Sequence, residues 1–157
     1  MIRLDRIDFE ILSRLQKDAR ISNKELAAEV GMAPSSMHER MRRLDESGVL
    51  LGFHAVVAPE ALGVRVQALI SVKISRHSRE LLDQFQDHLR SLPEVLAFYY
   101  LAGADDFRVH VATNNADGLR RLVIDQFTTR EEIEHMETQL IFGYESKHTL
   151  PNFAQET

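Results

Sequence analysis

The segment from Ser22 to Gly48 constrains the fold of this chain more than any other stretch of its sequence. Ser22 is followed three residues later by Glu25, and this spacing is typical of a capping box at the start of a helix. Gly31 and Pro34 favour a short turn and a new helix start, because proline lacks the N–H that a first helical residue leaves unpaired. Gly48 favours the end of the second helix, since glycine adopts the left-handed conformation readily. The segment therefore predicts two helices joined by a tight turn.

The second of these helices has one apolar and one polar face. Met37, Met41 and Leu44 recur at spacings of four and three, so they share the face that we expect to be buried. Arg40 projects between the two faces, and we expect it to pair with a structural carboxylate or a phosphate. The polar face begins with small hydroxyl side chains and continues with arginines, a pattern that suits entry of a helix into a DNA groove. The side chains expected to approach DNA are Ser35, Ser36, His38, Glu39, Arg42 and Arg43. The alternative is a solvated amphipathic helix with no DNA partner.

The flanking segments complete a small helical domain. Residues 4–18 predict an opening helix, in which Ile7, Ile11 and Leu15 recur at helical spacing and should pack under the other two helices. Residues 49–57 are rich in strand-forming side chains and predict a wing or a strand that leads out of the domain. We therefore expect an N-terminal, winged helix-turn-helix domain over residues 1–57 and a hinge over residues 58–63.

The charges of the chain are divided unevenly. The 157 residues carry a formal net charge of −5, from 19 Lys and Arg and 24 Asp and Glu. Residues 1–57 hold nine basic and nine acidic residues, so 10 basic and 15 acidic residues remain for the rest. This asymmetry favours two modules, with DNA contact confined to the first. A neutral DNA-binding module predicts modest affinity for one subunit, so tight binding would need a dimer or a larger assembly.

The composition excludes several classes of protein. The chain has no cysteine, which excludes disulfides and thiolate metal sites and is typical of a cytoplasmic protein. No apolar run approaches the length of a membrane span, and no charged and then apolar leader opens the chain. We therefore expect a cytoplasmic protein without a membrane partner.

The second half of the chain predicts a four-stranded sheet with two helices. Apolar residues alternate along four segments and recur at helical spacing along two others, in the order βαββαβ. This order is that of a ferredoxin-like domain, with both helices on one face of an antiparallel sheet. The elements are expected at residues 64–74, 78–91, 95–102, 107–111, 117–127 and 133–142. The fold class is therefore α+β, with this second domain covering residues 64–157.

The strands also carry apolar residues on the face that points away from the helices. Tyr99, Leu101 and Ile141 alternate against the inward-facing set. Since two helices cover only one face of the sheet, we expect a second subunit to cover the other.

Four motifs in fixed order make the chain resemble a known family. They are D-x-x-D-x-x-I-L from Asp5, R-I-S-N-K-E-L-A from Arg20, R-M-R-R-L-D-E-S-G-V-L from Arg40, and G-F-H-A from Gly52. Together they resemble the Lrp/AsnC family, the leucine-responsive and asparagine-responsive transcription regulators of bacteria and archaea. The resemblance implies a sequence-specific DNA-binding regulator modulated by an amino acid at a subunit interface. It also implies homodimers that gather into tetramers or octamers.

Two departures from the family pattern affect the expected sites. Ala33 stands where the family usually has serine as the cap of the recognition helix, and loss of that cap costs about 1 kcal/mol. The family's effector loop, G-x-[FY]-D, corresponds here to Gly103, Ala104, Asp105 and Asp106, where Asp105 replaces the aromatic residue. The resemblance implies that backbone amides of this loop hold the α-carboxylate and an aspartate holds the α-ammonium of an amino acid. The doubled aspartate would favour a cationic effector. The alternative is an ordinary Asp-rich turn.

Enzymatic readings find no support in the sequence. There is no recognisable nucleophilic triad, paired-histidine zinc motif or phosphate-binding glycine loop. The acidic run from Glu131 to Glu137, together with His135 and His148, could be drawn as a metal site, although a solvated strand edge is the simpler interpretation. We therefore expect neither an enzyme nor a bound cofactor. Two alternatives stay open, namely a small-molecule or metal sensor without a DNA target and a nucleoid-wrapping protein of low specificity.

Overall fold

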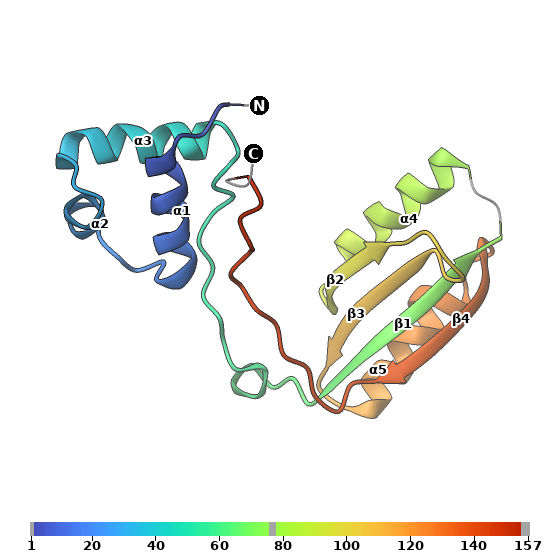
Figure 1. Cartoon of the computed structure of the whole chain (residues 1–157). Helices are drawn as coiled ribbons and strands as arrows, with labels where there is room; N and C mark the ends of the chain where they lie inside the picture. The colour runs from blue at the N-terminus through green and yellow to red at the C-terminus, as the bar shows by residue number, and fades with distance from the viewer. Residues whose placement is uncertain (1, 76–77, 155–157) are drawn as a thin grey trace. The chain divides into compact units, whose positions relative to one another are not determined.

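The computed structural model describes residues 2–75 and 78–154 and divides the chain into two compact units. One unit holds the chain up to Val56 together with the segment that follows Tyr144, and the other is Val57–Tyr144 (Figure 1). The predicted domain limits differ from these units in two respects. Val57 and the predicted hinge fall in the second unit, and the segment from residue 145, which was predicted in the second domain, groups with the first unit. The two outer limits of the predicted domains, residues 1 and 157, lie outside the described residues.

The N-terminal unit contains three helices, as predicted. They are α1 (Arg6–Lys17), α2 (Asn23–Glu29) and α3 (Pro34–Glu46). α1 and α2 each begin with a capping box, formed by Asp5 with Asp8 and by Ser22 with Glu25. The helices meet in a core of fully buried apolar side chains that includes Ile11, Leu26, Met37 and Leu44.

The two ends of α3 follow the sequence prediction. Ala33 is the N-cap residue and makes no side-chain hydrogen bond to the helix, while Pro34 occupies the first helical position. At the other end Gly48 has a φ angle of 70°, in the left-handed region that glycine tolerates. α3 therefore starts without the side-chain cap that α1 and α2 possess.

The predicted strand over residues 49–57 is not formed. The chain there has neither helix nor strand, and Leu51 and Val56 are 89% and 79% exposed. A strand is stabilised by hydrogen bonds to a neighbouring strand, and this segment makes no ladder with any described part of the chain. The predicted hinge contains a single 3₁₀ turn (Pro59–Leu62) followed by Gly63, whose φ angle is 79°.

The second unit has the predicted ferredoxin-like topology. Its strands are β1 (Val66–Ile74), β2 (Val95–Tyr100), β3 (Phe107–Thr113) and β4 (Ile133–Leu140). They form one antiparallel sheet in the order β2-β3-β1-β4. The helices are α4 (Arg79–Ser91) and α5 (Ala116–Val123), and a π-helical turn (Ile124–Thr128) extends α5.

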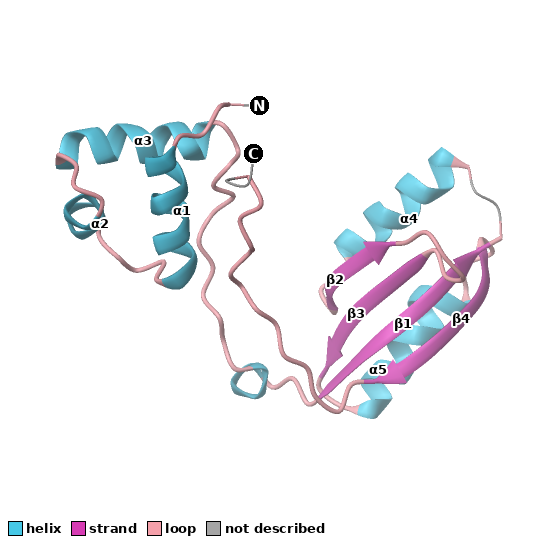
Figure 2. Cartoon of the chain, in the orientation of Figure 1, coloured by secondary structure: helices cyan, strands magenta, loops and turns pink. Residues whose placement is uncertain are grey.

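One face of the sheet packs against both helices. Ile70 and Val109, paired across β1 and β3, are fully buried beneath Phe85 of α4 and Leu122 of α5. The Phe85 and Phe107 rings meet edge to face with centroids 5.0 Å apart. Figure 2 shows the resulting two layers, strands in one and helices in the other.

The other face of the sheet has no cover from its own unit. The register places Leu69 beside His110, and Ser71 beside Arg108 and Glu137, on this outer face. Tyr99, opposite Arg108, is 59% exposed. The outer face therefore mixes apolar and polar groups, in contrast to the wholly apolar inner face.

The edge strand β4 departs from its predicted pattern. Met136 packs against the core as expected, but Thr138 is exposed, Leu140 is 54% exposed and Phe142, beyond the strand, is 98% exposed. As an edge strand, β4 has a neighbour on one side only, so alternation in its sequence does not ensure burial.

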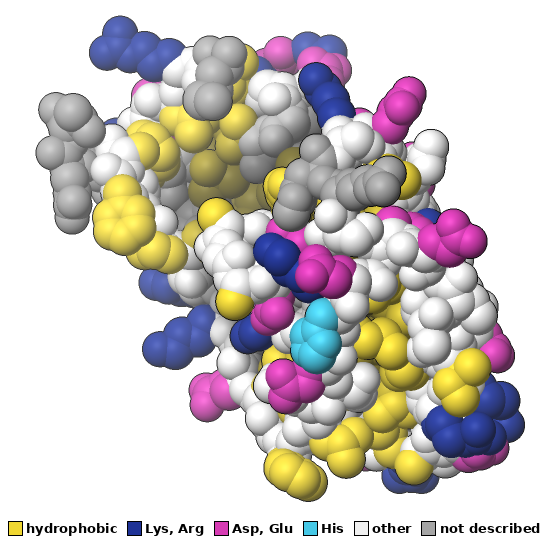
Figure 3. Space-filling view, turned by 90° about the vertical axis from the view of Figure 1, so that its right-hand side faces the viewer, with side chains coloured by type: hydrophobic (Ala, Val, Ile, Leu, Met, Phe, Trp, Pro, Cys, Tyr) yellow, Lys and Arg dark blue, Asp and Glu magenta, His cyan; other side chains and the backbone are white. Residues whose placement is uncertain are grey.

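Acidic and basic side chains are interspersed over the face of the molecule seen in Figure 3. Many of them form short-range ion pairs, such as Arg90 with Asp87 and Arg121 with Asp117. Among the described helices none is both long and apolar enough to cross a membrane.

Candidate DNA-binding surface and effector site

All six residues predicted to approach DNA lie exposed on α3. Ser35 and Ser36 occupy its first turn, while Arg42 and Arg43 lie near its C-terminal end. A shallow groove of 540 Å³ runs along this part of the helix. It is lined by Met32, Ser35, Ser36, Glu39, Arg40 and Arg43. Four of the six predicted residues line this groove, whereas His38 and Arg42 lie exposed outside it.

A buried carboxylate of α1 holds the recognition helix from behind. Asp8 is 0% exposed, and its Oδ1 accepts a hydrogen bond of 2.7 Å from Arg40 Nη1. Its Oδ2 accepts bonds of 2.6 Å from Arg43 Nη2 and 3.0 Å from the backbone N–H of Asp5. Arg40 Nη1 also donates to Asp5 Oδ2 at 2.8 Å. These contacts connect two turns of α3 to the first turn of α1, and we name them the Asp8 clamp.

The acidic and basic groups of the clamp stabilise each other's charged forms. The backbone N–H of Asp8 and the Arg40 guanidinium lower the pKa of Asp5 below its ordinary value. Hydrogen bonds to Asp5 and Asp8 raise the pKa of Arg40. The expectation that Arg40 pairs with a structural carboxylate is therefore confirmed.

Arg43 both contacts Asp8 and stays partly exposed on α3, and the sequence did not indicate the first of these roles. It was predicted to face DNA only, but it also belongs to the Asp8 clamp, and its side chain is 45% exposed. The sequence did not indicate the contact of Asp8 with α3. The D-x-x-D spacing was the available signal, because Asp8 completes a capping box and so points toward the same end of α1 as Asp5.

Arg42 is the most accessible arginine of the surface. Its Nη2 donates to Glu39 Oε1 at 2.7 Å, and its Nη1 lies 3.8 Å from Glu46 Oε1. The bond to Arg42 lowers the pKa of Glu39. All these groups are well exposed, and exposed pairs contribute little free energy, so Arg42 can exchange Glu39 for a phosphate or a base at small cost.

His38 links α3 to α2. Its Nδ1 lies 3.1 Å from the side-chain nitrogen of Asn23 while the ring stays exposed. This contact fixes the ring beside the predicted DNA surface.

The predicted effector loop connects β2 to β3. Gly103 and Ala104 are exposed, and Asp105 is half-buried with its Oδ2 3.2 Å from Arg108 Nη2. Asp106 is 6% exposed and accepts a 2.8 Å hydrogen bond from the backbone N–H of Ile74. Its other carboxylate oxygen lies 3.5 Å from Lys73 Nζ.

These contacts change the expected chemistry of the loop. Asp106 ties the loop to β1, and Lys73 and Arg108 already balance the two aspartates. The argument from a doubled aspartate to a cationic effector therefore loses its basis. The groups that stay open to a ligand are the backbone of Gly103 and Ala104 and the exposed part of Asp105.

The acidic run near β4 forms no metal site in the part of the chain that the structure describes. No group of three or more His, Asp or Glu there is arranged to hold a metal ion. Glu132 instead accepts a 2.6 Å hydrogen bond from Arg130 Nε.

Comparison with known protein families decides between the remaining alternatives. Residues 4–50 match the winged helix-turn-helix DNA-binding model, and residues 67–150 match the Lrp/AsnC ligand binding domain. The second match alone covers more than half of the chain. This chain belongs to the Lrp/AsnC family.

Individual Lrp/AsnC relatives agree with this assignment. The HTH-type transcriptional regulator AldR of Mycolicibacterium smegmatis is 43% identical over 141 residues, covering 90% of this chain and 82% of that protein. The leucine-responsive regulatory protein of Rhizobium meliloti is 33% identical, covering 88% of this chain and 89% of its own length.

Solved structures of Lrp/AsnC regulators share the fold. A transcriptional regulator of Neisseria meningitidis, determined as a complex with L-Met, superposes with a TM-score of 0.87 at 25% identity, covering 98% of this chain and 99% of that one. E. coli AsnC gives 0.82 at 28% identity, covering 95% and 99%. The protein is thus a DNA-binding transcriptional regulator of the Lrp/AsnC type and not an enzyme. A sensor without a DNA target is excluded as its main function.

Proposed function

We propose that this Lrp/AsnC regulator reads a specific DNA sequence through the exposed face of α3 and is modulated by an amino acid bound beside the loop Gly103–Asp106 at a subunit interface. The observation that carries the DNA proposal is the Asp8 clamp. It fixes α3 from behind and leaves Ser35, Ser36 and Arg42 free to meet a groove. Phosphate contacts would position the helix, and contacts to base edges would give specificity.

Substitution of single arginines tests the DNA proposal. Arg42→Ala should weaken binding to the upstream region of the protein's own gene by about 1–3 kcal/mol if Arg42 contacts a base. Arg90→Ala on α4 is the matched control, since Arg90 is also exposed and also pairs with an acid three residues earlier. Gel-shift titrations on this duplex and on a scrambled duplex give the ratio of specific to nonspecific affinity.

The outcome separates three cases. Loss confined to the specific duplex supports base recognition, and equal loss on both supports a phosphate contact and moves the protein toward low-specificity wrapping. Unchanged binding for both Arg42→Ala and Arg43→Ala would remove α3 as the reading surface.

The effector proposal rests on the open backbone of Gly103 and Ala104 in the predicted effector loop. Successive backbone N–H groups can donate hydrogen bonds to an α-carboxylate, and the exposed part of Asp105 can accept a hydrogen bond from an α-ammonium. The Neisseria relative, solved with L-Met, supports a free amino acid as the class of ligand. Such a ligand changes DNA affinity only if it binds two assembly states with unequal affinity.

Thermal unfolding with a panel of the common amino acids tests this proposal. We expect at least one to raise Tm and to alter the size-exclusion profile. Gly103→Val should abolish the rise because its side chain would occupy the space that a carboxylate needs. If no amino acid shifts either measurement, the loop is a structural turn and the protein acts without an effector.

A second subunit on the outer face of the sheet completes the proposal. Leu69, Tyr99 and Ile141 lie on this face among polar groups that can pair across an interface. Two buried polar atoms on it, Ser71 Oγ and Arg108 Nε, have no hydrogen-bond partner among the described residues. Buried polar groups are normally satisfied, so a partner chain that supplies bonds to them is the arrangement that this face favours.

A further inference from the structure

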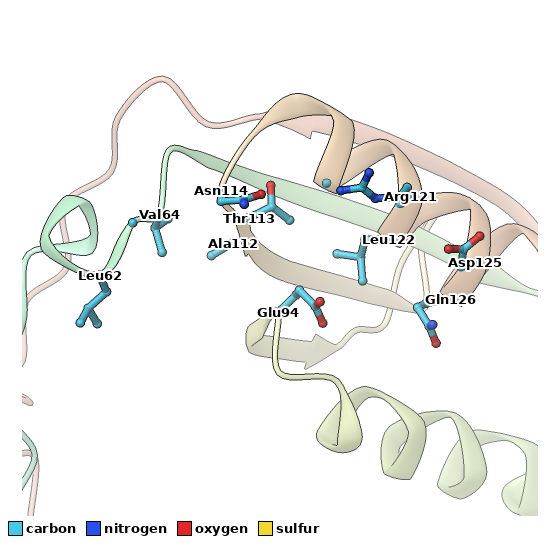
Figure 4. Close-up of a pocket in the computed structure, with 12 residues that line it drawn as sticks. Leu62, Val64, Glu94, Ala112, Thr113, Asn114, Arg121, Leu122, Asp125 and Gln126 are labelled. Carbon is cyan, nitrogen blue, oxygen red and sulfur yellow. The ribbon is translucent and has the colours of Figure 1, made fainter.

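A separate cavity of 480 Å³ lies in the second unit, between α5 and the residue that precedes β2 (Figure 4). Its walls also include the chain just before β1, at Leu62, Gly63 and Val64. The volume falls within the range of small-molecule sites, which is about 300–1,000 Å³. The cavity is remote from the Gly103–Asp106 loop along the hairpin, because Glu94 precedes β2 and that loop follows the end of β2.

The lining combines unpaired carboxylates with other polar side chains and with apolar ones such as Leu122, Val64 and Ala112. The half-buried Glu94 carboxylate has no hydrogen bond or ion pair within the described part of the chain. Figure 4 shows Glu94 and Leu122 directed into the space between α5 and the start of β2, with Gln126 at one end of the cavity and Ala112 and Val64 toward the other. An unpaired carboxylate in such surroundings favours a cation whose remaining part is apolar.

The neighbouring cation does not neutralise Glu94. Arg121 also lines the cavity, but its Nη1 donates to Asp117 Oδ2 at 2.9 Å on the solvent side of α5. Asp125 adds a second carboxylate without a side-chain partner among the described residues, so the lining is acidic overall.

We propose that this cavity binds a small aliphatic primary ammonium compound at a site distinct from the effector loop. The Glu94 carboxylate accepts hydrogen bonds from the ammonium group, and the side-chain oxygen of Gln126 accepts another. The carbon chain packs against Leu122 and Val64. Since Leu62 and Gly63 belong to the predicted hinge, the bound compound also orders the segment that leads to the DNA-binding unit.

Isothermal titration calorimetry on the full-length protein tests the proposal with three probes, namely cadaverine, L-lysine and L-norleucine. We expect cadaverine or L-lysine to bind and L-norleucine, whose side chain carries no charge, to bind at least tenfold more weakly. Preference for cadaverine would identify an amine as the ligand, and preference for L-lysine would identify a basic amino acid.

Three variants locate the site. Glu94→Gln keeps the shape and removes the charge, so it should weaken the binding of cadaverine at least tenfold. Gln126→Glu adds a further carboxylate to the cavity and should strengthen the binding of cadaverine. Glu131→Gln changes an exposed acid outside the cavity. It is the matched control and should leave the binding of cadaverine unchanged.

Amide chemical shifts then place the bound probe. With cadaverine, ¹H–¹⁵N spectra should change at Gly63, Ala112 and Gly118 and stay constant at Gly103. Absence of binding by the wild-type protein at millimolar cadaverine, or equal binding by Glu94→Gln, would overturn the proposal. Shift changes confined to residues 103–106 would overturn it as well, because they would assign the probe to the effector loop.

Discussion

Asp8 shows how one buried carboxylate can fix a recognition helix. The side chain is fully buried, yet both of its oxygens accept bonds from guanidinium groups of α3. A buried charge is costly unless its hydrogen-bonding capacity is used, and here two arginines and a backbone N–H use it. The arrangement gives α3 one orientation relative to α1.

Removal of this carboxylate should destabilise the N-terminal unit. We expect Asp8→Ala to lower the free energy of unfolding by about 3–5 kcal/mol, because Arg40 and Arg43 lose their buried partner. Asp45→Ala, at an exposed position on α3, should change the free energy of unfolding by about 0.5 kcal/mol or less. Urea unfolding followed by circular dichroism measures both. Equal effects of the two substitutions would show that the clamp does not stabilise the fold.

His110 should make the stability of the second unit depend on pH. Burial lowers the pKa of His110 below its ordinary value of 6.5, so the unfolded chain takes up this proton at a higher pH than the folded chain does. The contribution of neutral His110 to the stability of the folded state is fully present above pH 6.5. It is lost as the pH falls from there through the pKa of His110 in the folded chain. We expect a lower Tm at about pH 5.5 than at about pH 7.5, and a smaller difference in His110→Gln. An unchanged difference in that variant would assign the pH dependence to other groups.

At the scale of elements, local signals were enough to predict the helices. The capping pair Ser22 and Glu25, Pro34 at a helix start and Gly48 at a helix end all act over a few residues. The prediction of a strand over residues 49–57 was wrong, because strand formation depends on a partner that the local sequence does not specify.

The functional surfaces were predicted to different degrees. The accessible face of α3 followed from helical periodicity alone. The contact of Asp8 with Arg43 joins residues 35 positions apart, and that of Asp106 with Ile74 joins residues 32 apart. Such pairings depend on how elements pack, which composition and periodicity do not determine. The sequence therefore predicted only part of what Asp106 and Arg43 do. It did not predict their contacts with β1 and with α1.

The uncapped start of α3 offers a test at this scale. Ala33 already has the extended backbone of an N-cap residue, with φ −71° and ψ 142°. Ala33→Ser should therefore add a hydrogen bond to the first turn without changing the backbone, and should stabilise the N-terminal unit by about 1 kcal/mol. Ala33→Val, which has no acceptor, should give no gain. Thermal unfolding compares the two variants, and a gain equal for both would show that capping is not its cause.

For the molecule as a whole, affinity for DNA depends on self-association. The three arginines of α3 are all paired within the chain, and residues 1–57 are neutral in sum. One recognition helix then gains little from electrostatic attraction. Two helices presented by one assembly raise the effective concentration of the second at its half-site and so increase affinity without any new contact.

Disruption of the outer sheet face tests this link between assembly and DNA binding. Leu69 lies at the centre of that face on β1, so Leu69→Lys places a charge where the second subunit is proposed to pack. Size-exclusion chromatography with light scattering should then show a monomer, and DNA affinity should fall although α3 is intact. Ile124→Lys is the matched control, because Ile124 is 43% exposed on the helical side and should leave the oligomer unchanged. A Leu69→Lys protein that stays oligomeric would place the subunit interface elsewhere. A monomer that binds DNA as tightly as the wild type would instead show that one recognition helix suffices.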